Sequence, residues 1–246
     1  MQTISGYHRP DDLEEAIALL NRSDTATLVV AGATRVGAGL DTGDEVVDIQ
    51  AFADDSITSH GDSISYGSMV RLQHLVDHES TPPLLAETAR REGPNTLRNA
   101  ATIGGTVATA DSESELVAGL LAHEARIAIA RSEGTIEVPL EELLDDRSLL
   151  TGGIITSITV DGSGETASAR TGRTPADTSI VAAAGRVVVD GFRIALTGVA
   201  AHPVLVDPAD VEQLEPPGDF RGSSKYRREL ARVLTKRVIE LLGGTA

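Results

Sequence analysis

The sequence predicts an α+β fold of two units, divided near residues 146–153. In the first unit, short β-branched runs alternate with apolar stripes at helical spacing. From residue 154 onward, strands joined by turn signals dominate, and one long helix closes the chain. The 246 residues are 41% hydrophobic and 24% charged, which is typical of a globular protein and excludes a disordered chain.

The first predicted element is a helix over residues 11–21. Asp11 and Glu14 have the spacing of a capping box, and an apolar stripe follows at Leu13, Ala16, Ile17 and Leu20. Residues 27–30 form a short β-branched run, which predicts a strand. This strand leads directly into a loop of small residues, 31–39.

Alternating elements are predicted between that loop and residue 145. A second small-residue loop, residues 98–110, carries almost no charge and precedes a helix. Ser132-Glu133-Gly134 separates two alternating runs and predicts a hairpin. The predicted elements are strands at 45–49, 63–67, 126–130 and 135–138, and helices at 71–78, 83–92, 116–123 and 139–145.

The second unit is predicted to be an antiparallel sheet covered by a helix. Its strands are expected at 154–160, 180–189 and 192–199, the last two joined by Asp190-Gly191, a two-residue hairpin signal. The terminal helix is expected to stop at Gly243-Gly244, after apolar residues at helical spacing: Tyr226, Leu230, Val233, Leu234, Val238 and Leu241.

Composition excludes several classes of function. Without cysteine the chain forms no disulfide or thiolate metal site, and any iron–sulfur cluster must belong to another chain. A net charge of -16 without a basic block argues against nucleic-acid binding. No apolar run approaches the roughly 18 residues of a membrane helix, and the start lacks a signal peptide. We therefore expect a cytoplasmic protein.

Two polar groups have simpler explanations than a site. His74 and His78 have the i, i+4 spacing of a metal pair, but no third ligand is identifiable. Asp111, Glu113 and Glu115 lie at the start of a predicted helix, where acidic residues interact favourably with the helix dipole. No nucleophile elbow accompanies the serines, so we predict neither a metal site nor a catalytic triad.

The two small-residue loops are the most informative feature. Bare backbone N–H groups at such turns can surround a pyrophosphate closely. Neither loop fits the dinucleotide-binding or Walker glycine pattern, so composition alone leaves a tight packing turn as an equal alternative.

Six segments, taken in chain order, favour a ligand-binding role for the two loops. The most specific is Arg98-Asn99 followed by Ala101-Thr102-Ile103-Gly104-Gly105; the six are residues 7–20, 29–39, 45–52, 98–116, 177–200 and 225–237. Together they resemble the FAD-binding medium subunit of the molybdenum hydroxylases, the family of carbon monoxide dehydrogenase and xanthine dehydrogenase. The resemblance covers nearly the whole chain.

The resemblance implies a domain plan and a cofactor. Residues 1–148 would be a PCMH-type FAD-binding domain of two α+β subdomains, and residues 149–246 a small C-terminal domain of the carbon monoxide dehydrogenase flavoprotein type. FAD would lie extended, with its pyrophosphate against residues 29–36 and its ring and ribityl chain near residues 102–106. The implied FAD-binding residues are Val29, Val30, Ala31, Gly32, Ala33, Thr34, Arg35, Val36, Thr102, Ile103, Gly104, Gly105, Thr106, Glu115, Ile155 and Arg170.

The chemistry of these residues suits such a ligand. Gly32, Gly104 and Gly105 let the backbone approach without a Cβ, and the hydroxyls of Thr34 and Thr102 are potential donors to phosphate or flavin oxygens. An anion held by backbone amides requires no lysine, which suits so acidic a chain.

Several positions depart from the family pattern. Ala33 replaces a glycine, and an alanine is compatible with this loop only if its φ is negative. Thr106 replaces an asparagine, which removes an amide, and Glu115 replaces an aspartate. Ala169 stands where a flavin-contacting lysine is common. Arg35 replaces an acidic or polar residue and could offer a cation to the pyrophosphate.

The resemblance implies an electron-transfer flavoprotein, with no side chain acting as a catalytic acid or base. Electrons would come from a molybdenum-cofactor large subunit, through an iron–sulfur small subunit, and leave to NAD, a quinone or another acceptor. Two alternatives stay open: a free-standing FAD-dependent oxidoreductase of the same superfamily, and a flavin-free structural subunit.

Overall fold

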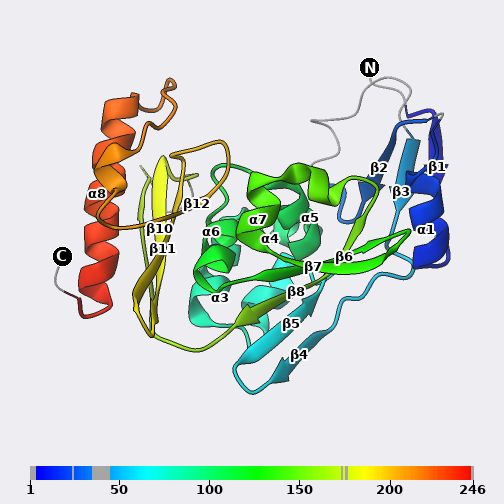
Figure 1. The fold of residues 1–246 in the computed structure, drawn as a ribbon, viewed down its shortest axis with the longest axis horizontal. Coiled ribbons are helices and arrows are strands. Elements are labelled where there is room, and N and C mark those ends of the chain that lie inside the picture. The colour runs from blue at the N-terminus through cyan, green and yellow to red at the C-terminus, as the bar shows by residue number, and fades with distance from the viewer. Residues whose placement is uncertain (1–3, 24, 35–44, 173, 175–176, 245–246) are drawn as a thin grey trace.

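The computed structural model describes residues 4–23, 25–34, 45–172, 174 and 177–244. These residues form three sheets that lie in a row, with helices between and around them (Figure 1). Helices and antiparallel strands occur together in this arrangement, which confirms the predicted α+β class.

The N-terminal sheet is parallel, with β3 between β1 and β2. Its elements are β1 (Gly6–His8), α1 (Leu13–Leu20), β2 (Thr27–Val30) and β3 (Glu45–Asp48). The capping prediction was one residue early, because Asp12, in an extended conformation, is the N-cap and its Oδ1 accepts a hydrogen bond from the Glu15 N–H at 2.9 Å. The three-residue edge strand β1 was not predicted.

The central sheet has five antiparallel strands in the order β4-β5-β8-β6-β7. They are β4 (Ile57–His60), β5 (Ser63–Gly67), β6 (Arg126–Arg131), β7 (Gly134–Pro139) and β8 (Ile154–Asp161). The assignment of residues 154–160 to the C-terminal sheet was wrong, because β8 pairs with both β5 and β6. A domain boundary between residues 148 and 149 stays a prediction, and this pairing favours one after Asp161.

Six helices of the described residues are grouped with the central sheet, and five of them contribute buried residues to the hydrophobic core that they share with it. They are α2 (Leu72–Asp77), α3 (Pro83–Arg91), α4 (Asn95–Arg98), α5 (Ile103–Thr109), α6 (Glu115–Ala122) and α7 (Leu140–Asp145). Helix α5 falls in the segment predicted as a loop of small residues, and α4 ends at the first residue of that segment, Arg98. Helix α5 lies so close to Ser68 that a glycine is needed at position 104. A Cβ on Gly104 would lie 2.8 Å from the Ser68 Cβ.

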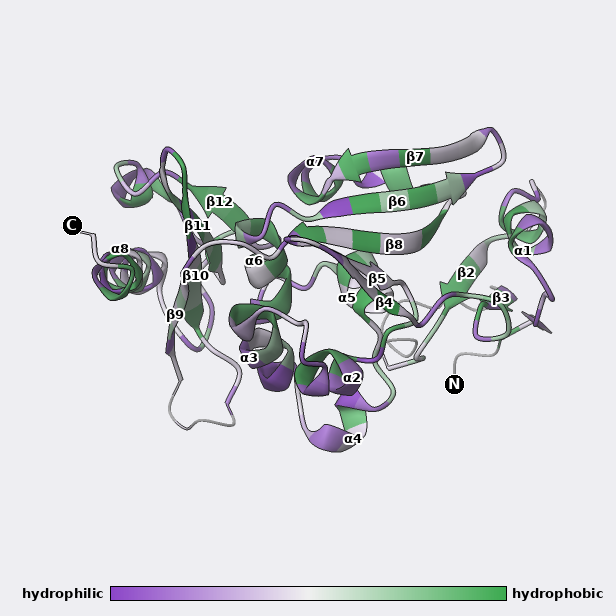
Figure 2. Cartoon of the chain, turned by 90° about the horizontal axis from the view of Figure 1, so that it is seen from below, coloured by the Kyte–Doolittle hydropathy of each residue, from purple (hydrophilic) through white to green (hydrophobic). Residues whose placement is uncertain are grey.

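The C-terminal sheet is antiparallel, in the order β12-β11-β10-β9. Its strands are β9 (Thr166–Thr171), β10 (Val181–Val188), β11 (Gly191–Thr197) and β12 (Val204–Val206). Val188 pairs with Gly191, so the two-residue turn is Val189-Asp190, one residue before the predicted one. Helix α8 (Ser224–Leu241) packs on β9 and β10, and the apolar helix α6 contacts β10 and β11 (Figure 2).

A buried arginine joins the C-terminal sheet to the rest of the chain. Arg186 on β10 is 2% exposed. Its Nε donates to the Ala122 carbonyl at 2.9 Å, and its Nη1 donates to Asp161 Oδ2 at 2.8 Å. Glu124 contacts the other terminal nitrogen. These bonds hold β10 against the end of α6 and the end of β8.

Candidate functional site

A cavity of about 750 Å³ opens where the N-terminal sheet meets α5 and β8. Both small-residue loops line it, although about 70 residues separate them in the sequence. The predicted residues that line the cavity are Val29, Val30, Ala31, Gly32, Ala33, Thr34, Thr102, Gly104, Gly105, Thr106 and Ile155. The structure therefore brings most of the predicted set together in one place.

The two loops touch through bare backbone at Gly32. A Cβ at this position would lie 1.9 Å from the Ala100 carbonyl oxygen, so no other residue fits without a backbone shift. This contact places the segment Ala31–Thr34 directly against the chain entering α5.

The first loop presents amide groups with a strained turn among them. Ala33 has a φ of 55°, so the condition of a negative φ is not met. The loop follows a left-handed path that glycine adopts freely, and a side chain there costs roughly 1–2 kcal/mol. The N–H groups of residues 31–34 donate no hydrogen bond to another described residue, which leaves them as donors for an anion.

The second loop begins α5 and uses its hydroxyls within the helix. Thr102 Oγ1 accepts a hydrogen bond from the Gly105 N–H at 3.1 Å and caps the helix. Thr106 Oγ1 donates to the Thr102 carbonyl at 3.0 Å, so towards the cavity it can only accept. Donation from the Thr34 and Thr102 hydroxyls to a ligand stays a prediction.

Three predicted residues lie away from the cavity wall. Ile103 is fully buried in the core. Glu115 Oε1 accepts from Arg170 Nε at 2.8 Å, and its Oε2 accepts from Arg91 Nη1 at 2.9 Å. These pairs tie β9 and α3 to the first residue of α6. The buried Ala169 packs within the C-terminal core, and Arg35 and Val36 lie outside the described residues.

Sequence reasoning missed several parts of the cavity wall. Residues 150–153 precede β8, and their Gly152-Gly153 doublet was a usable signal. Glu92, Asp111 and Ser114 form another part. Burial raises the pKa of Glu92, and the charges of Glu115 and Asp111 add to this effect. No local pattern distinguishes Glu92 from Glu87, the other glutamate of that helical run.

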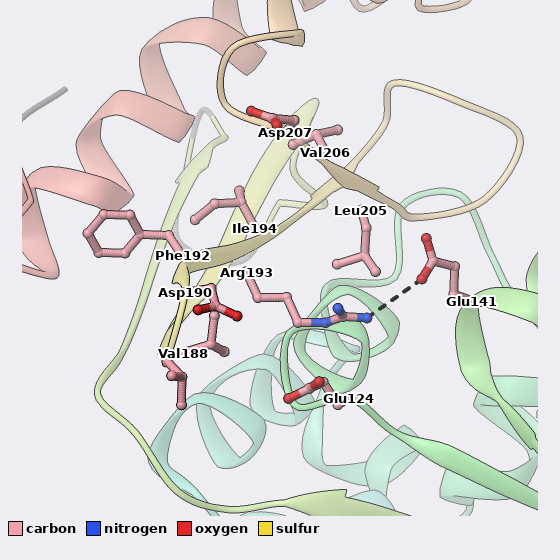
Figure 3. A pocket seen from close by; sticks show the side chains of 11 residues that line it. Glu124, Glu141, Val188, Asp190, Phe192, Arg193, Ile194, Leu205, Val206 and Asp207 are labelled. Carbon is pink, nitrogen blue, oxygen red and sulfur yellow. Dashed lines mark ion pairs between the residues drawn. The ribbon is translucent and has the colours of Figure 1, made fainter.

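A second pocket, of about 570 Å³, lies between the β10–β11 hairpin, β12, α6 and α7 (Figure 3). None of the predicted site residues lines it. Arg193 reaches into this pocket and forms an ion pair with Glu141 at 3.6 Å. We therefore place the candidate site in the 750 Å³ cavity.

The described residues form no group of three or more histidine, aspartate and glutamate side chains arranged to hold a metal ion. His74 and His78 pack edge to face, with ring centroids 5.5 Å apart. Within the same part of the chain, no helix combines the length and the hydropathy needed to cross a membrane.

Comparisons with known proteins find relatives over most of the chain. The family model for the FAD binding domain in molybdopterin dehydrogenase matches residues 2–160. YgfM of Escherichia coli K12 is 29% identical, with 94% of this chain and 93% of that protein aligned. The alpha subunit of the 6-hydroxypseudooxynicotine dehydrogenase complex of Paenarthrobacter nicotinovorans is 27% identical, with 95% and 92% aligned.

A solved structure shows the same fold. A chain of carbon monoxide dehydrogenase from Hydrogenophaga pseudoflava superimposes with a TM-score of 0.87 at 23% identity. The superposition covers 98% of this chain and 97% of that one.

Proposed function

Because the chain belongs to the family of FAD binding domains in molybdopterin dehydrogenases, as the sequence resemblance predicted, we propose that it is the electron-transfer flavoprotein subunit of such a dehydrogenase. FAD is the cofactor of this family. The observation that carries the proposal is the contact at Gly32, which joins both small-residue loops around one cavity.

The residues that line the cavity fit FAD. The N–H groups of residues 31–34, which donate to no other described residue, suit the pyrophosphate, which needs donors rather than cationic side chains. Gly105 and Thr106 on α5 and Ile155 on β8 are proposed to contact the ring and ribityl chain. The wall is rich in apolar side chains and backbone, which excludes water from a bound ring.

The proposed role of the protein is to bind FAD and to orient it. FAD supplies the redox chemistry when it is bound, so no side chain has to act as an acid or base. Glu115 and Arg170, by pairing with each other, are proposed to hold the start of α6 in place beside the cavity. The strained turn at Ala33 keeps its amides directed at one ligand group.

The proposed partners are an iron–sulfur small subunit and a molybdenum-cofactor large subunit. The Paenarthrobacter relative is a subunit of a dehydrogenase complex, which supports an assembly of this kind. The chain has no cysteine, so clusters must be held by another subunit. We place the complex in the cytoplasm, with NAD, a quinone or another compound as the electron acceptor.

The first test is an absorption spectrum of the purified chain before and after addition of FAD, followed by reduction with dithionite. Retained flavin that bleaches on reduction supports the proposal. A chain that stays colourless and retains no FAD contradicts it and favours the flavin-free structural subunit.

A second test separates the complex from a free-standing oxidoreductase. Co-purification of the tagged chain with a cysteine-rich small subunit and a large subunit is the expected result. Substrate oxidation by the isolated flavin-loaded chain, without those partners, would favour the free-standing enzyme.

A further inference from the structure

Glu92 is the feature of the cavity that its proposed role leaves unexplained. The residue follows α3, and its side chain reaches the start of α6. Oε1 accepts two hydrogen bonds, from Ser114 Oγ at 2.8 Å and from the Leu116 N–H at 2.9 Å. Oε2 has no hydrogen-bond partner among the described residues. One oxygen is thus fixed by α6, and the other is available to a ligand in the cavity.

The charges around Glu92 disfavour its ionised form. Asp111, in the segment before α6, also lines the cavity. Glu115 of α6 contributes a further negative charge, although Arg91 and Arg170 pair with it. No lysine, arginine or histidine is among the described residues that line the cavity. Burial, Glu115 and Asp111 raise the pKa of Glu92 despite its two hydrogen bonds.

A bound FAD strengthens this effect. Its pyrophosphate is anionic, and its rings displace water that would otherwise solvate the carboxylate. An Asn or Gln side chain carries no charge and would avoid this desolvation and repulsion cost. A glutamate at this position therefore affects FAD binding.

We propose that Glu92 determines how the cavity takes up FAD: it binds the cofactor as the neutral acid, its free oxygen donating a hydrogen bond to an acceptor atom of FAD. This inference rests on the proposed function. The proton comes from solvent, so FAD binding is coupled to the uptake of one proton. Oε1 keeps its two bonds to α6 in either protonation state.

The sign of the pH dependence follows from this coupling. Below the pKa of Glu92 in the empty cavity, the acid is already protonated and FAD binds without proton uptake. Above that pKa, each pH unit weakens FAD binding by up to about tenfold, because the proton must be taken from an increasingly dilute pool. The pKa is raised, so the window lies above the ordinary glutamate value of 4.5.

The test is a titration of the full chain with FAD, monitored by flavin fluorescence and repeated at pH values from about 5 to about 8. Glu92→Gln is the informative variant, because its amide oxygen can accept the same two bonds while its NH₂ replaces the acid proton. Glu79→Gln, at an exposed position outside the cavity, is the matched control. Thermal unfolding of each variant verifies that the fold is kept.

For the wild type and Glu79→Gln we expect FAD dissociation constants that rise with pH, and for Glu92→Gln a constant that stays flat and is lower at about pH 8. Calorimetry in two buffers of different ionisation enthalpy should detect proton uptake by the wild type and none by Glu92→Gln. An unchanged pH slope in Glu92→Gln overturns the inference. A failure of every form to bind FAD at any pH contradicts the proposed function instead.

Discussion

The Cα of Gly32 faces the carbonyl oxygen of Ala100 so closely that a Cβ would lie 1.9 Å from it. Gly32 belongs to the loop after β2, and Ala100 precedes α5. The contact joins the two loops that form the proposed FAD site. The shape of the cavity therefore depends on the absence of a side chain at Gly32.

Replacement of Gly32 by alanine should therefore destroy the site. The new methyl group must displace backbone, which costs about 1–3 kcal/mol of folding free energy. We expect FAD affinity to fall at least about tenfold, because a loss of about 1.4 kcal/mol of binding free energy weakens binding by that factor. Fluorescence titration and denaturant unfolding measure both effects. Gly218→Ala, in an exposed loop outside the cavity, where the added Cβ would lie 3.3 Å from the nearest atom, should leave FAD affinity unchanged and lower stability less than Gly32→Ala.

Ala33→Gly should have the opposite sign. The substitution relieves the left-handed strain of roughly 1–2 kcal/mol, and the greater freedom of glycine in the unfolded chain offsets about 0.5–1 kcal/mol of that gain. We expect equal or higher stability, by up to about 1 kcal/mol. Ala26→Gly, at an exposed position without positive φ, should lower stability. A loss of stability in Ala33→Gly would contradict the strain argument.

Thr106 is a position where FAD affinity can be raised. Its hydroxyl proton is held by the Thr102 carbonyl, so the side chain offers the cavity no donor. Thr106→Asn supplies an amide and should strengthen FAD binding by about 0.5–1.5 kcal/mol. Thr106→Val removes the remaining acceptor and should weaken it. Equal affinities in all three forms would show that FAD does not contact this side chain.

Asp161 should make stability depend on pH in the acid range. Burial acts to raise its pKa, but hydrogen bonds from Ser163 and Arg186 outweigh it and lower the pKa to about 2, from an ordinary value of 3.8. The native state thus favours the ionised form, and this stabilisation is lost as the pH falls from about 4 to about 2. The carboxylate is 42% exposed, which reduces the effect through solvent screening.

Denaturant unfolding across this pH range tests the role of Asp161. Asp161→Asn should be less stable than the wild type at neutral pH, and the difference should shrink towards pH 2. Asp190→Asn, at an exposed aspartate in the β10–β11 turn, should follow the wild-type curve. A difference between Asp161→Asn and the wild type that does not vary with pH would argue against the ion pair with Arg186.

Local sequence patterns were sufficient for most elements and for the two loops. The strands at 27–30 and 63–67 have their predicted bounds, because alternation and flanking turn residues are local properties. The helix α5 was missed because Gly and Ala weaken the periodic signal that identifies a helix. The strand β8 was placed in the wrong sheet, because its pattern fits any sheet with a buried face.

Residue type and order along the chain were enough to predict the α+β class, the two small-residue loops and the family resemblance. The tertiary structure alone decided that Ala33 turns left-handed, that Glu115 pairs with Arg170, and that Glu92 lines the cavity. Each of these depends on contacts between distant segments. Such contacts set backbone strain, burial and charge, and the short-range periodicity of a sequence does not encode them.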